Sequence, residues 1–119
     1  MRNRMAKVSI IYWKEIPAQV RAEDADGEIT LPLPDRFQQG IDAVAMFDGS
    51  YGADAYLEAW DWGPEVEVRG AAQEAAEALA RKIAARFPAD FVGRIRALHE
   101  AGQRDPRPGA VDHWMNESK

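Results

Sequence analysis

The side chains of this sequence that could transfer protons or hold a metal ion are its two histidines and its 20 acidic residues. His99 and His113 adjoin no serine in a nucleophile-elbow pattern, and the chain offers no Ser-His-Asp order. His99-Glu100 and Asp112-His113 are sequence neighbours, and neighbours on a helix diverge by about 100° instead of converging on one ion. We therefore predict no catalytic residues and no metal ligands.

The sequence contains no cysteine, which excludes a thiolate nucleophile, a disulfide and an Fe–S cluster. The acidic stretch Glu23–Glu28 lacks the ligand ladder of an EF-hand, and the glycine-containing stretch Asp48–Gly52 matches neither phosphate-binding glycine pattern. We interpret the first as a solvated hairpin turn and the second as a helix end followed by a turn. No cofactor is predicted.

Aromatic residues are the most unusual local feature. Five of them fall on two stretches that we predict to be strands: Tyr12, Trp13, Tyr56, Trp60 and Trp62. If these strands are neighbours, the rings form one cluster, and such a cluster is most often core because large rings supply much of a small domain's buried area. The alternative is a face for a ligand or a protein partner, where tryptophan and tyrosine are enriched. Lys14 and Glu15 would lie at the rim of that face.

The strand that must position these rings is predicted over Lys7–Trp13, which has the densest β-branched and aromatic content of the chain. Pro17 is expected to end or divert it. Ile29–Leu33 alternates as an edge strand, because Pro32 cannot donate a ladder hydrogen bond. The remaining predicted strands are Gln19–Ala22 and Asp54–Trp62, and Val66–Val68 is either a short strand or an extended lead into the next helix.

Three helices are predicted from apolar periodicity: Asp35–Phe47, Ala71–Phe87 and the shorter Asp90–Ala101. Gly40 within the first is expected to allow close approach of a neighbouring element. These elements predict an α+β fold with a three- to four-stranded, mainly antiparallel sheet, two main helices on one face and a short third helix. A variant of the ferredoxin-like arrangement is one way to connect them.

Length and charge narrow the class of protein further. The 119 residues fit a single domain, which we place at residues 1–102, followed by a linker-like, flexible C-terminal tail at 103–119. The last ten residues of this tail are either disordered or docked through Trp114. A net charge of -5 argues against nucleic acid as a partner, despite the small basic cluster of Arg2, Arg4 and Lys7. Without a membrane-spanning stretch or a secretory signal in the sequence, we expect no membrane partner and a cytoplasmic location.

Three blocks of the sequence resemble the small bacterial "virulence factor" domain family, of the conserved-virulence-factor type. They are Ile11–Val20, Arg36–Gln38 together with Ile41–Met46, and Asp54–Trp60, and their order and spacing agree with the family. The resemblance carries no catalytic residues. It implies an accessory protein encoded beside folate- and corrinoid-dependent one-carbon enzymes. The acidic stretch Glu23–Glu28 and the sequence Trp60-Asp61-Trp62 depart from the more basic family pattern.

Two functional hypotheses follow. The first is a non-enzymatic accessory protein that binds a protein partner, a one-carbon methyltransferase or reductase by the resemblance, at the exit of the first strand. Its candidate binding residues are Trp13, Lys14, Glu15, Pro17, Gln19, Tyr56 and Trp60. The second is a small-molecule-binding protein or enzyme that uses the five aromatic residues as a stacking platform, with Glu15, Tyr56 or Glu58 as polar groups.

Overall fold

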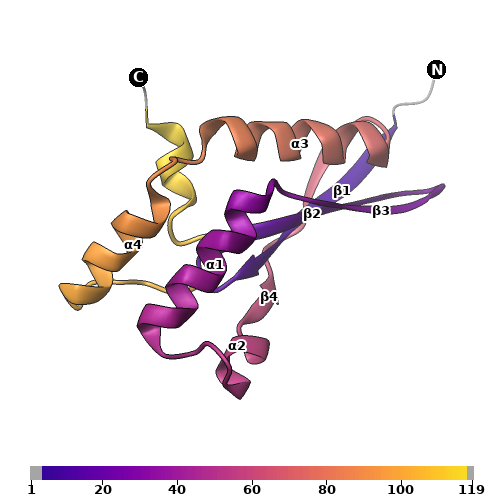
Figure 1. The fold of residues 1–119 in the computed structure, drawn as a ribbon. Helices are drawn as coiled ribbons and strands as arrows, with labels where there is room; N and C mark the ends of the chain where they lie inside the picture. Colours follow the sequence, from indigo (N-terminus) through magenta and orange to yellow (C-terminus); the bar gives the residue numbers. More distant parts are fainter. Residues whose placement is uncertain (1–3, 118–119) are drawn as a thin grey trace.

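The computed structural model describes residues 4–117, and Figure 1 shows their arrangement. Arg2 of the predicted basic cluster lies outside the described residues. The strands are β1 (Met5–Trp13), β2 (Ile16–Asp24), β3 (Gly27–Pro32), β4 (Trp60–Trp62) and β5 (Val66–Arg69). The helices are α1 (Asp35–Asp48), α2 (Asp54–Glu58), α3 (Ala72–Arg86) and α4 (Phe91–Glu100), followed by the 3-10 helix η1 (Asp112–Asn116).

The sheet is antiparallel in every described pairing, with the order β3-β2-β1 and with both β4 and β5 on the far edge of β1. β5 pairs with Met5–Val8 and β4 with Ile11–Trp13, so these two short strands share one edge. This confirms the predicted α+β fold with an antiparallel sheet led by the first strand. Three strands precede the first helix, whereas a ferredoxin-like fold alternates from its first strand to a helix.

Pro17 does not end β1, contrary to the prediction. The chain already turns at Lys14 and Glu15, and Lys14 has the left-handed φ of 51°. Pro17 lies inside β2 opposite Tyr12, where the register of the β1–β2 pair shifts. A residue without an N–H is tolerated at such an irregularity, since one ladder hydrogen bond is already missing there.

The stretch 54–62, predicted as one strand, is instead the helix α2 followed by the three-residue strand β4. Its aromatic residues favoured a strand, but alanine, leucine and glutamate between them have good helix propensity. Tyr56 packs its ring against Trp13, with 5.6 Å between the ring centroids. The helical conformation is therefore consistent with the propensity of these residues and is held by contacts with Trp13 from outside the stretch.

The core lies between the sheet and the helices α1 and α3, which cover the same face of the sheet in Figure 1. The rings of Phe37, Phe87 and Phe91 meet where α1, α3 and α4 converge. The structure confirms that Gly40 allows a close approach, because a Cβ at this position would overlap the Phe91 ring. α4 can therefore approach α1 closely at this point.

The C-terminal segment packs on the domain as far as the structure describes it. Trp114 is 8% exposed and lies 6.3 Å from the Phe87 ring, between centroids, and Val111 is buried as well. Of the two alternatives for this segment, the described part shows docking through Trp114. Within the described residues, no helix has the length and apolar character needed to cross a membrane.

Candidate functional site

The exit of β1 is held by a buried ion pair. Nε and Nη2 of Arg104 donate to the two carboxylate oxygens of Glu15 at 2.7 and 2.8 Å, and Nη1 donates to Oδ2 of Asp48 at 2.9 Å. The side chains of Glu15, Arg104 and Asp48 are only 0%, 8% and 3% exposed. Glu15, predicted at the rim of a binding face, therefore lies in the interior and fixes the C-terminal segment to the β1–β2 turn.

Asp48 completes this network. Lys14 Nζ donates to its Oδ2 at 2.8 Å, and the backbone N–H and hydroxyl of Ser50 donate to its Oδ1 at 3.0 and 2.6 Å. Burial alone raises the pKa of Asp48, but the hydrogen bonds from Lys14, Ser50 and Arg104 outweigh it and hold the pKa below its ordinary value. Asp48 is therefore an ionised structural acceptor at neutral pH and is not poised to transfer protons.

Trp13 and Lys14 attach the next part of the chain to this turn. Trp13 is 0% exposed, and its indole N–H donates to the backbone carbonyl of Tyr56 at 2.9 Å. The backbone N–H of Lys14 donates to the carbonyl of Ala59 at 3.2 Å. The residues at the strand exit thus form the base on which α2 and β4 are placed.

α2 itself has no buried residue, and Figure 1 shows it projecting beyond the end of the sheet. We use the name α2 surface for Tyr51, Tyr56, Leu57 and Trp60. Leu57 is 70% exposed and Tyr51 is 59% exposed. The Tyr56 ring contacts Tyr51 and Trp60, with its centroid 6.1 Å from Tyr51 and 6.3 Å from Trp60, and its hydroxyl donates to Oδ1 of Asp42 at 3.0 Å. Leu57 is the next residue of α2.

The predicted binding residues divide into two groups. Trp13, Glu15 and Pro17 are buried and cannot touch a partner in this conformation. The others are at least partly exposed: Lys14, Gln19, Tyr56 and Trp60. Trp13, Tyr56 and Trp60 come together as expected, whereas Gln19 lies along β2 opposite Ile11.

Sequence reasoning missed Tyr51 and Leu57. A helical reading of residues 54–58 would have left Leu57 without a core face to occupy, since so short a helix has no complete apolar stripe. Tyr51 stands between Gly49 and Gly52 in a turn, and no periodic pattern marks it. The sequence predicts the turn itself, but it does not indicate that the Tyr51 ring stays exposed there.

The five predicted aromatic residues do not form one platform among the described residues. The Tyr12 hydroxyl donates to Oδ2 of Asp112 at 2.5 Å, which draws this ring to the C-terminal segment. Trp62 is 51% exposed, and its ring lies 5.6 Å from the guanidinium carbon of Arg21 on β2. Only Trp13, Tyr56 and Trp60 remain in mutual contact through Tyr56.

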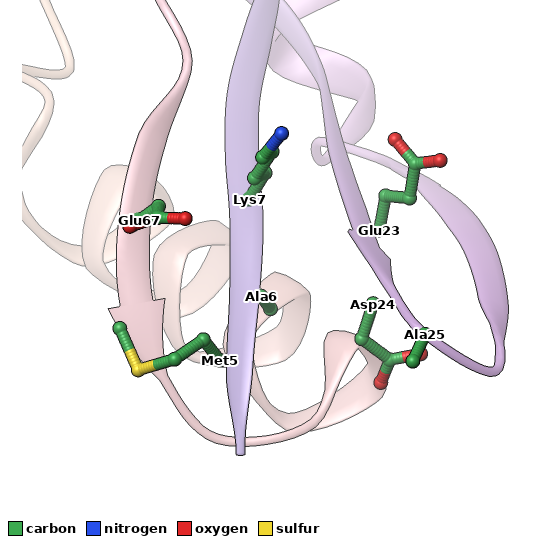
Figure 2. A pocket seen from close by; sticks show the side chains of 7 residues that line it. All are labelled: Met5, Ala6, Lys7, Glu23, Asp24, Ala25 and Glu67. Carbon is green, nitrogen blue, oxygen red and sulfur yellow. The ribbon is translucent and has the colours of Figure 1, made fainter. Parts of the chain in front are cut away.

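A hollow of about 260 Å³ lies at the other end of the sheet. Figure 2 shows Lys7 on β1 between Glu67 of β5 and Glu23 of β2, which are its register partners. Asp24 in this hollow is already engaged, because it accepts the backbone N–H of Ala72 at the start of α3. Among residues 4–117, no group of three or more histidine, aspartate or glutamate side chains could hold a metal ion.

Comparison with known proteins identifies one family. The family model described as "Virulence factor" matches residues 11–95, a range that contains the strand exit, α1 and the α2 surface. No curated protein and no solved structure matches the chain.

Proposed function

The chain belongs to the virulence factor family, and we propose that it is a non-enzymatic accessory protein that binds a protein partner through its α2 surface. The observation that carries this proposal is the exposure of Leu57, which lies on a helix without any buried residue, and of Tyr51 in the turn before that helix. Large apolar side chains gathered at the surface mark interaction sites, and tyrosine is frequent among the residues that dominate binding energy.

The strand exit supports this role indirectly. Trp13 and Lys14 hold the α2 segment by two hydrogen bonds, and the buried pair of Glu15 and Arg104 fixes the turn beneath it. A surface placed on a rigid base needs less ordering when a partner binds, so more of the contact energy appears as affinity. In this proposal the buried motif residues position the surface, and the exposed residues make the contact.

The partner class comes from the resemblance. Folate- and corrinoid-dependent one-carbon enzymes, a methyltransferase or a reductase in particular, are the first partners to test. The carboxylates at the strand exit support a role without catalysis, since Glu15 and Asp48 both have their oxygens engaged by cations and N–H groups.

The experiment is affinity capture from native lysate, followed by quantitative mass spectrometry and then by purified candidate enzymes. We expect Leu57→Ala and Tyr51→Ala each to reduce recovery of the partner by about tenfold or more, as truncation of interface hot spots does. Val66→Ala is the matched control, because Val66 is an apolar residue 53% exposed on β5. It should leave recovery unchanged.

Undiminished recovery with both α2-surface variants contradicts the proposal. Gln19→Ala is included because Gln19 is the exposed residue of the predicted strand-exit rim. A loss with Gln19→Ala but not with Leu57→Ala would place the contact on β2 instead.

A further inference from the structure

We infer that the α2 surface recognises a basic, amphipathic segment of its partner, in which lysine or arginine side chains flank apolar ones. This inference rests on the proposed function and specifies the chemistry of the partner. It is carried by the distribution of charge around the α2 surface.

Charge is strongly segregated along the chain. Residues 37–68 contain no lysine, arginine or histidine and seven acidic residues: Asp42, Asp48, Asp54, Glu58, Asp61, Glu65 and Glu67. Since the whole chain has a net charge of -5 and this stretch has -7, the other residues together carry +2. The stretch that contains the α2 surface therefore has a larger net negative charge than the whole protein.

Four of these carboxylates lie on or next to the residues that form the α2 surface. Asp42 accepts the Tyr56 hydroxyl, Asp54 and Glu58 begin and end α2, and Asp61 follows Trp60. None of the four has an ion-pair partner among residues 4–117, in contrast to Asp48, which Lys14 and Arg104 neutralise. Asp54, Glu58 and Asp61 are exposed, so their charges act on whatever approaches Leu57.

A partner that covers Leu57 also approaches Asp54 and Glu58, which are exposed on the same short helix. Leaving charged groups desolvated and unpaired is strongly unfavourable, whereas cations opposite them restore the lost interactions and accelerate encounter. Complementary charge therefore selects a basic partner, and the same charges disfavour an acidic or neutral one. A second copy of the chain is disfavoured too, because a symmetric contact would bring two sets of like charges together.

The test is a titration of the full, isotope-labelled chain with three synthetic peptides of equal length, followed by NMR. The first is an amphipathic lysine–leucine peptide, the second replaces lysine by glutamate, and the third replaces leucine by serine. We expect amide shifts at residues 51–61 with the lysine–leucine peptide alone. Its binding should weaken by about tenfold or more between about 50 mM and about 300 mM salt, because surface charges are screened.

Charge-reversal variants locate the effect. Asp54→Lys with Glu58→Lys should abolish the shifts at residues 51–61, while Leu57→Ala should weaken them. The matched control is Glu74→Lys with Glu77→Lys on α3, which changes the net charge equally at exposed helix positions. Thermal unfolding of both double variants checks that the fold is kept.

Three results would overturn the inference: equal binding of the glutamate–leucine peptide, binding insensitive to salt, or shifts centred on the acidic hairpin tip Glu23–Glu28. The failure of this inference and that of the proposed function are distinguishable. Partner capture that needs Leu57 but ignores salt and the Asp54/Glu58 reversal overturns the basic-segment inference and leaves the proposed function standing. Capture that is unchanged by both Leu57→Ala and Tyr51→Ala overturns both.

Discussion

At the scale of single residues, the buried charges at the strand exit show how a polar motif can be structural. Glu15 has an exposed fraction of 0%, and both of its oxygens accept from Arg104, which lies 89 positions further along the chain. A buried charge left without its partner is strongly destabilising, because the protein has removed it from water.

We predict that Arg104→Ala lowers the free energy of unfolding by about 3–5 kcal/mol, as removal of one partner of a buried ion pair does. Arg107→Ala is the control, because Arg107 pairs with Asp105 on the surface and such pairs contribute about 0–1 kcal/mol. Urea unfolding measures both values. A loss below about 1 kcal/mol for Arg104→Ala contradicts a structural role for the network.

The ionisation of Asp112 makes the stability of the protein depend on pH. Burial raises its pKa above the ordinary value of 3.8, although the hydrogen bond from Tyr12 acts to lower it. Its other oxygen, Oδ1, is buried without a hydrogen-bond partner among the described residues. A raised pKa in the folded state means that folding favours the protonated acid, so this stability is present at low pH and is lost as pH rises above the ordinary pKa.

We therefore predict that the wild type loses stability relative to Asp112→Asn as pH rises from about 4 to about 7, since asparagine does not titrate. Unfolding free energies of both proteins across this range give the comparison, and the contribution of Asp48 cancels because both proteins contain it. If the difference in unfolding free energy between the two proteins stays constant, or grows in favour of the wild type, the raised pKa of Asp112 is contradicted.

At the scale of elements, the contact between α1 and α4 depends on one missing side chain. We predict that Gly40→Ala destabilises the protein by about 1–3 kcal/mol, because the new methyl group overlaps Phe91 and forces the helices apart. We expect Gly93→Ala on α4 to stabilise the protein instead, because nothing lies within 4 Å of the added Cβ and alanine favours a helix over glycine by about 1 kcal/mol. Thermal or urea unfolding of the two variants measures both changes in stability. A stabilising effect of Gly40→Ala would contradict the close approach of α1 and α4.

The elements with a clear period could be predicted from the sequence. β1, α1, α3 and α4 were found with boundaries close to those observed, because each has an apolar pattern of its own. α2 could not be found, since five residues with no buried face leave no pattern to detect. The turn at Lys14 was also missed, because Pro17 is the stronger local signal for a strand end.

The candidate site was predicted in composition but not in arrangement. Trp13, Tyr56 and Trp60 do meet, yet their meeting depends on a hydrogen bond from the Trp13 indole to a backbone carbonyl 43 positions away. Glu15 was expected to be exposed because an isolated glutamate usually is. Its burial depends on Arg104, and a single sequence contains no signal for so distant a pair.

At the scale of the whole molecule, the two ends of the sheet differ in how their acidic residues are paired with cations. The buried ion-pair network and the α2 surface lie at the exit of β1, and the acidic hairpin between β2 and β3 extends at the opposite end in Figure 1. The charged residues of the hairpin are compensated in part, since Arg21 pairs with Glu28 at 2.6 Å. The carboxylates around α2 have no such cation among the described residues, so the two acidic regions differ in what they offer a partner.

Site-specific photo-cross-linking in living cells tests the α2 surface most directly as the place of partner contact. A photoreactive aromatic amino acid replaces Leu57 in one protein and Glu77, an exposed position on α3, in a second. We expect a discrete cross-linked protein at position 57 and none at position 77. Cross-linking at position 77 alone, or equal products at both positions, would contradict it.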